Sequence, residues 1–266
     1  MKKLTRALAL VLALVSVLAL AACGKDDKTD DSDMAYVKDK GTLIVGITDF
    51  EPMDYRDANG EWIGFDADMA KKFAEHLGVD VEFQEIGNWD MKATELETKA
   101  VDVVWNGMTI TDEVKGLMGV SKAYCNNAQV VVVKADVADQ YQTVDSIKSL
   151  TFAAENGSAG AAELDALDVE YTAVDTQAKA LMEVASGSVD ACVIDSLMAA
   201  AMVGEGTDYD DLTYTVGLNS EEYGVGFRKN SDLIAEFNSF WDDATKDGTV
   251  EAVAETYGVQ AALISD

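Results

Sequence analysis

The sequence predicts an α/β protein built from two similar lobes. Apolar segments rich in β-branched residues alternate along most of the chain with segments whose apolar residues recur at helical spacing. Two segments, Leu96–Asn106 and Met182–Asp195, repeat one pattern: a helix, a small residue, Val-Asp, an apolar strand and a polar end. The alternation favours mostly parallel sheets, and the repeat indicates that each lobe presents a strand end to a shared cleft.

The start of the chain is typical of an export signal. Lys2, Lys3 and Arg6 precede an apolar run that is too short for a comfortable transmembrane helix, and the run ends in Leu-Ala-Ala before Cys23. This resembles the bacterial lipobox, so we expect residues 1–22 to be removed and Cys23 to be lipidated. A plain secretory peptide with an incidental cysteine is the alternative. Residues 23–35 are polar and charged, which predicts a flexible tether.

The composition excludes several classes of partner and chemistry. The full chain has 20 Lys and Arg residues against 49 Asp and Glu residues, a net charge of −29, which disfavours nucleic acid and anionic membrane surfaces. One histidine and no CxxC motif leave a zinc site or a Ser-His-Asp triad without its usual parts. Beyond Cys23 only Cys125 and Cys192 remain, and their spacing permits a disulfide without requiring one. We expect no metal, no cofactor and no catalytic residue.

The elements can be placed in order. Thr42–Ile47 is apolar and β-branched and predicts a buried strand, and the loop after it holds the only proline, Pro52. A helix is expected over Phe65–Gly78, with Asp66 able to cap its start and Gly78 able to end it. The same rules predict further strands at Val79–Phe83, Val101–Trp105, Ala128–Lys134, Thr151–Ala154, Val169–Val174, Val189–Asp195, Thr213–Val216 and Tyr223–Arg228. They predict further helices at Trp89–Ala100, Asp112–Met118, Ala161–Leu167, Thr176–Ser186, Ser196–Val203, Ser231–Lys246 and Thr249–Tyr257.

Polar residues follow the expected strands at four places. In open α/β sheets ligands bind outside the carboxyl ends of the strands, so these places are candidate sites: Thr48–Phe50, Asn106–Thr109, Asn156–Gly160 and Asp195. At the second place, a buried strand stops at Asn-Gly and a helix start follows, which leaves N–H groups and hydroxyls to face a small polar ligand. An ordinary strand–turn–helix connection is the alternative there.

These residues also resemble a known family. The resemblance rests on Gly41–Ile47, Asn59-Gly60, Gly64-Phe65-Asp66, Asn106–Thr111 and Tyr223–Lys229, and it extends over nearly the whole mature chain. The chain is similar to the polar amino-acid-binding proteins of ABC importers, the family 3 extracytoplasmic solute-binding proteins. The resemblance implies a type II, two-lobed, periplasmic-binding-protein-like fold with a central cleft and two hinge crossings. Lobe 1 would comprise residues 36–127 and 223–266, and lobe 2 residues 128–222.

The resemblance also implies a set of ligand-binding residues. Phe50 would stack on the ligand or else pack its loop, Asp49 beside it could accept from an ammonium group, and Asp195 would bind the α-amino group. Asn106, Gly107, Met108 and Thr109 would receive a carboxylate, and a second loop with Gly157, Ser158 and Ala159 would complete that clamp. Trp89 is expected to wall the pocket or to pack in the core, and Asp195 could also cap the following helix.

One position departs from the family pattern. Family members usually carry an arginine that grips the ligand carboxylate with two hydrogen bonds, and the matching residue here is Val114. Lys115 could supply only a point charge. Either the carboxylate is held by N–H groups, Thr109 and Ser158, or the ligand is an amino acid with extra positive charge or a small amine.

These features predict a binding protein that is not an enzyme. We expect a monomer, anchored by its lipid to the outer face of the bacterial cytoplasmic membrane, which delivers an amino acid or a related solute to an ABC transporter permease. A binding protein for a non-standard amine is the alternative. A dehydratase-like enzyme on the same scaffold would need a general acid in the cleft, and a sensory receptor would need a transmembrane helix and a signalling domain.

Overall fold

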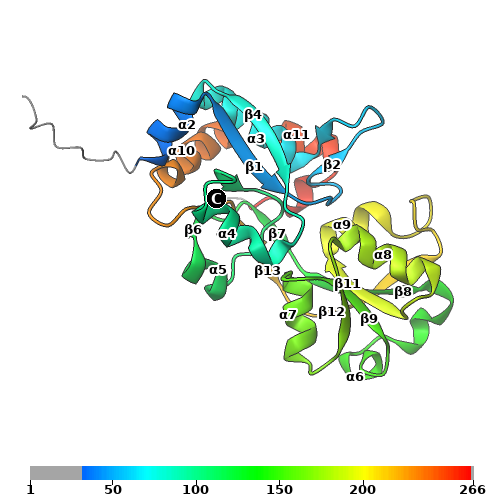
Figure 1. The fold of residues 1–266 in the computed structure, drawn as a ribbon. Coiled ribbons are helices and arrows are strands. Elements are labelled where there is room, and N and C mark those ends of the chain that lie inside the picture. Colours follow the sequence, from blue (N-terminus) through cyan, green and yellow to red (C-terminus); the bar gives the residue numbers. More distant parts are fainter. Residues whose placement is uncertain (1–31, 265–266) are drawn as a thin grey trace, which may run out of the picture. The chain divides into compact units, whose positions relative to one another are not determined.

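The computed structural model describes residues 32–264, of which the part from Asp33 onward forms one compact unit (Figure 1). The expected signal peptide, Cys23 and most of the expected tether lie outside the described residues. The fold begins earlier than expected, because Asp33 opens helix α2 (Asp33–Lys40) and its carboxylate accepts a 2.7 Å bond from Nε of Arg228. Within residues 32–264, no helix has the length and apolar character needed to cross a membrane.

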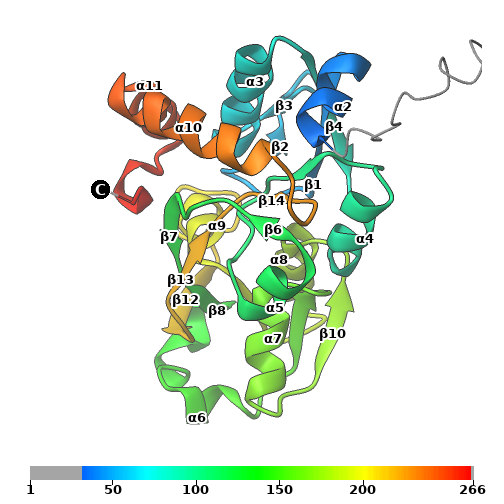
Figure 2. The ribbon, with the colours of Figure 1, turned by 90° about the vertical axis from the view of Figure 1, so that its left-hand side faces the viewer.

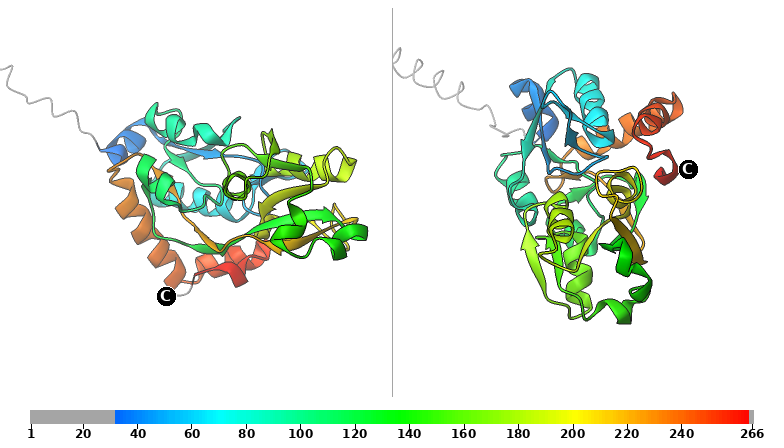
Figure 3. Two further views of the ribbon diagram at one scale, coloured as in Figure 1. Left: turned by 90° about the horizontal axis from the view of Figure 1, so that it is seen from below. Right: turned by 90° about the vertical axis from the view of Figure 1, so that its right-hand side faces the viewer.

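The first lobe is a five-stranded sheet with helices packed on it. The strands follow the order β4-β1-β5-β14-β6. They are β1 (Thr42–Ile47), β4 (Asp80–Glu85), β5 (Val103–Val104), β6 (Gly119–Val120) and β14 (Gly226–Phe227). The helices are α2, α3 (Phe65–Leu77), η1 (Trp89–Met91), α4 (Lys92–Glu97), α5 (Asp112–Leu117), α10 (Leu233–Lys246), α11 (Thr249–Tyr257) and η3 (Gln260–Ala262). A small hairpin, β2 (Tyr55–Arg56) with β3 (Trp62–Ile63), precedes α3. The C-terminal helices lie beside this lobe in the right-hand view of Figure 3.

The second lobe has a sheet of the same size and plan. Its strand order is β10-β9-β11-β8-β12. The strands are β8 (Gln129–Lys134), β9 (Phe152–Glu155), β10 (Tyr171–Val174), β11 (Ala191–Asp195) and β12 (Leu212–Gly217). The helices are η2 (Ala135–Gln140), α6 (Val144–Ile147), α7 (Ala159–Ala166), α8 (Gln177–Ser186) and α9 (Ser196–Met202).

The two sheets correspond strand by strand. In lobe 1, β1 pairs in parallel with β4 and β5, and in lobe 2, β9 pairs in parallel with β10 and β11. Strands β5 and β11, which the sequence repeat singled out, both occupy the third position. The expectation of mostly parallel sheets holds for all but one strand of each sheet, since β14 and β8 run antiparallel to both of their neighbours. The reason is topological: each of these strands enters its sheet from the opposite lobe.

Two neighbouring strands carry the chain between the lobes. Strand β7 (Cys125–Asn127) pairs antiparallel with β13 (Glu221–Tyr223), and Figure 2 shows both between the two sheets. The single strand expected over Tyr223–Arg228 is therefore two short strands, β13 and β14. Because the crossings pair with each other, they form one narrow connection between the lobes.

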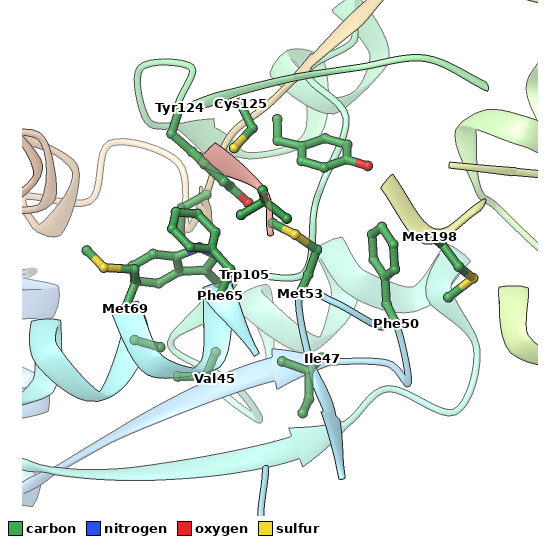
Figure 4. Packing of buried hydrophobic residues seen from close by; sticks show 14 of the residues in the cluster. Val45, Ile47, Phe50, Met53, Phe65, Met69, Trp105, Tyr124, Cys125 and Met198 are labelled. Atoms are coloured by element: carbon green, nitrogen blue, oxygen red, sulfur yellow. The ribbon is translucent and has the colours of Figure 1, made fainter. Parts of the chain in front are cut away.

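The core of each lobe follows from strand periodicity. Along β8, Val131 and Val133 pack in the cluster that contains α7, while Val130 and Val132 pack in the cluster that contains α8. Both faces of the sheet are covered by helices, which explains why the strand reads as a continuous apolar run. In lobe 1, Trp105 at the end of β5 is fully buried among Phe73 and Phe237 (Figure 4 shows part of this cluster).

Candidate functional site

A cavity of about 320 Å³ is lined by residues of both lobes. It lies where the carboxyl ends of β5, β9 and β11 meet, as the rule for open α/β sheets predicts. Ten of the expected ligand-binding residues line it: Trp89, Asn106, Gly107, Met108, Thr109, Val114, Gly157, Ser158, Ala159 and Asp195.

Two expected residues do not line this cavity. Asp49 lines a second cavity, of about 240 Å³, together with Glu51, Arg56 and Glu85. Burial, and then the charge of Glu85, raise the pKa of Asp49. Phe50 is 1% exposed, lies near Met198 in Figure 4 and meets the ring of Tyr223 edge-on. Phe50 therefore does not line this cavity, and its enclosure agrees with the alternative that it packs its loop.

The turn after β5 is held mainly by bonds inside the protein. Oδ1 of Asn106 accepts from the Thr48 N–H at 2.9 Å, and its Nδ2 donates to Thr48 Oγ1 at 2.9 Å. The Gly107 N–H donates to Asp66 Oδ2 at 2.7 Å, and Thr109 Oγ1 donates to Glu221 Oε1 at 2.9 Å. Several donors that were expected to hold a ligand carboxylate are therefore used within the fold.

Asp66 is not the cap of α3 that its position suggested. Gly64 is the N-cap residue and makes no side-chain capping bond, while Asp66 is fully buried and accepts from Gly107 N–H and from Tyr124 OH. Burial raises the pKa of Asp66 to about 7. Asp54 is buried beside it, and among the described residues neither of its carboxyl oxygens has a hydrogen-bond partner. The two carboxyls form an acidic pair beneath the turn that carries Gly107.

Asp195 ends β11 and lines the cavity, and its carboxylate oxygens already accept several hydrogen bonds from the protein. Oδ1 accepts from Tyr223 OH at 2.7 Å, from Gln129 Nε2 at 3.0 Å and from Asn127, and Oδ2 accepts from Gln177. It makes no capping bond to α9. Burial, and next the charge of Glu221, raise its pKa to about 7. The remaining acceptor capacity is on Oδ2, toward which a ligand ammonium could donate.

Glu155 was not among the expected ligand-binding residues. It ends β9, lines the cavity and is 3% exposed, and its Oε1 has no hydrogen-bond partner among the described residues. Burial, and then the charge of Asp195, raise its pKa to about 8, while Lys92 acts in the opposite direction. Its sequence signal was available, since an acid directly after an apolar strand follows the same strand-end rule as Asp195.

Lys92 was also missed, and it brings a cation to the cavity. It opens α4, and its Nζ donates to Trp89 O at 3.3 Å and to Gly157 O at 3.2 Å, the second bond reaching across to lobe 2. Burial lowers the pKa of Lys92. Because an ammonium group has three hydrogens, these two bonds leave one for another acceptor. The sequence predicts that Lys92 is an ordinary exposed helix residue. Its position at the cavity follows only from the contact between the two lobes.

The departure from the family pattern persists in the fold. Val114 is 7% exposed and lines the cavity, and Thr111 caps the helix that holds it. Lys115 is exposed and does not line the cavity. Arg56 stacks over Trp62 and Arg228 pairs with Asp33, so neither of these described arginines reaches the cavity.

The lobes touch beside the cavity through two short segments. Asn156 Nδ2 donates to Asn88 Oδ1 at 2.9 Å, near the bond from Lys92 to Gly157. Gly157 has φ +73°, and a Cβ placed there would lie 2.6 Å from Cα of Asp90. Only glycine therefore allows the backbones to approach this closely.

The fold and the cavity define a two-lobed solute-binding protein. Residues 43–260 match the model of the bacterial extracellular solute-binding proteins, family 3, and the chain belongs to this family. It is 29% identical to the L-cystine-binding protein TcyJ of Escherichia coli strain K12, over 92% of this chain and 94% of that protein.

Solved structures agree with this assignment. A mutant of the arginine-binding protein from T. maritima superposes with a TM-score of 0.79 at 33% identity, covering 85% of this chain and 98% of that one. An ABC uptake transporter substrate-binding protein from Streptococcus pneumoniae with bound histidine superposes with a TM-score of 0.80 at 28% identity, covering 88% and 99%. The family and the type II fold that the sequence motifs implied are confirmed.

Proposed function

We propose that this protein captures an amino acid in the cavity between its lobes and delivers it to a membrane importer without catalysing a reaction. The observation that carries the proposal is that groups of both charges line the cavity. Lys92 and the N-terminus of α7 supply positive charge, and Glu155 and Asp195 at the strand ends supply carboxyl groups. An amino acid carries one carboxylate and one ammonium group, so it complements both kinds of group. The relatives named above bind cystine, arginine or histidine, which supports this class.

The cellular setting is part of the proposal. Cys23 would carry a lipid anchor at the outer face of the cytoplasmic membrane, and the monomeric protein would dock on an ABC permease. Ligand contacts from both lobes would stabilise the closed arrangement around β7 and β13, because a ligand that bridges the lobes binds that arrangement more tightly. The support for the anchor is the sequence before Cys23, and the support for the permease is the family.

A thermal-shift screen of the purified protein against the standard amino acids tests the proposal. A ligand at a hundredfold excess over its Kd should stabilise the protein by about 2.7 kcal/mol, which is a shift of several degrees. Small amines without a carboxylate belong in the same screen, because Val114 replaces the expected arginine and several expected donors are occupied. Stabilisation by amines alone would replace the amino acid with an amine ligand, and a flat response to both sets would refute the proposed function.

A further inference from the structure

We propose that Glu155 binds a positively charged group of the ligand and makes the site selective for amino acids with a net positive charge over neutral ones. This inference rests on the proposed function and names the substrate class of the same site. It starts from the state of the carboxyl group itself. Glu155 is 3% exposed, and its Oε1 has no hydrogen-bond partner among the described residues. A buried acceptor left without a donor is costly, so the fold leaves this atom unsatisfied until a donor enters the cavity.

Hydrogen bonds with Thr48 and Gln177 favour the charged form of the Glu155 carboxyl, but they leave its Oε1 without a partner among the described residues. Lys92 is the cation that lines the cavity, yet no ion pair within 4.0 Å joins it to Glu155 among residues 32–264. Its Nζ instead donates to the carbonyls of Trp89 and Gly157. Gln177 uses its Nε2 to donate to Asp195 Oδ2. Glu155 lines the cavity while its Oε1 is itself enclosed, so a ligand donor reaches that oxygen when the side chain turns toward the cavity.

A neutral amino acid has no second positive group that could pair with the carboxyl of Glu155. Lys92 and the start of α7 suit its carboxylate, and the open acceptor position on Asp195 Oδ2 suits its ammonium group. Glu155 is then a second buried carboxyl in the same cavity. A ligand with one more positive charge satisfies it and also offsets the repulsion between Glu155 and Asp195.

The rest of the cavity wall favours the same class. Three further carboxyls, those of Asp90, Glu113 and Asp165, line it at exposed positions, and the lining residues include no arginine. These exposed groups are screened by solvent, so they add a weak general attraction for cations. The desolvated carboxyl of Glu155 provides the discrimination, because charge-assisted bonds are strongest where water is excluded.

Calorimetric titration with L-arginine and L-citrulline tests this inference, because the two differ in the charge of the side chain and little in shape. Wild-type protein should bind arginine at least about 10-fold more tightly than citrulline. Glu155→Gln keeps the shape of the side chain and should weaken arginine by about 10-fold or more while leaving citrulline within a few-fold. Glu170→Gln makes the same change at an exposed residue of lobe 2 that does not line this cavity, so it is the matched control and should leave the preference in place.

The outcomes separate this inference from the proposed function. If the wild type binds neutral amino acids as tightly as arginine, or if Glu155→Gln keeps the arginine preference, Glu155 does not select the ligand, although amino-acid capture stands. If the wild type binds no amino acid, both proposals fall. A thermal unfolding curve for each variant shows whether it is folded, and the wild-type ratio tests the inference even if Glu155→Gln is unstable.

Discussion

Replacing Gly107 with alanine should destabilise the protein markedly, because the added Cβ disfavours the left-handed backbone and also meets neighbouring rings. The residue has φ +53°, and an added Cβ would lie 2.4 Å from Cε1 of Phe50 and 3.1 Å from Cε2 of Tyr223. The left-handed backbone costs a residue other than glycine about 1–2 kcal/mol. The contact costs roughly 1–3 kcal/mol more, since Phe50 is 1% exposed and has no free space to move into. Gly107→Ala should therefore lose about 2–5 kcal/mol of unfolding free energy.

Urea unfolding followed by tryptophan fluorescence measures this loss. Gly116→Ala is the matched control, because Gly116 lies inside α5 and an added Cβ meets nothing within 4 Å. Alanine favours a helix over glycine by about 1 kcal/mol, so the control should be neutral or slightly stabilised. If Gly107→Ala and Gly116→Ala unfold at the same urea concentration, the close packing of Phe50 under the turn is not what requires glycine there.

Three further predictions concern the buried charges. Burial raises the pKa of Asp66 from its ordinary 3.8 to about 7, so the native state binds more protons than the unfolded state across that window and stability falls as pH rises through it. Asp54→Asn should remove the repulsion between the carboxyls of Asp54 and Asp66. The stability of this variant relative to the wild type should therefore be higher at pH 8 than at pH 5, and a difference in denaturation midpoint that stays constant with pH would contradict this. Arginine affinity by calorimetry should fall between pH 8 and pH 6 as Glu155 and Asp195 take up protons, and a flat profile would count against cation binding there. Lys92→Met should weaken arginine by about 10-fold while sparing agmatine, which has no carboxylate, and equal losses for both would show that Lys92 acts by joining the lobes.

The sequence predicted most elements because their signals are local. Thr42–Ile47 is the strand β1 at the expected bounds, and Gly78 ends α3 in the left-handed conformation expected of a C-cap glycine. Short elements such as α2 and β7 were missed, since their stability comes from tertiary contacts such as the Asp33–Arg228 pair and the pairing of the crossings. The direction of β14 and β8 was also out of reach, because it depends on which lobe each strand comes from.

For the site, the sequence alone determined that Asn106–Thr109, Gly157–Ala159 and Asp195 belong together, because strand ends meet at one edge of a sheet and the family motifs agree. Only the tertiary structure decided which of their polar atoms remain free. In the tertiary structure the Gly107 N–H donates to Asp66, Phe50 is enclosed in the core, and Oε1 of Glu155 has no hydrogen-bond partner among the described residues. Hydrogen bonds between residues far apart in the chain depend on how distant segments pack, within one lobe for Gly107 and Asp66 and between the lobes for Lys92 and Gly157, and no local pattern encodes that packing.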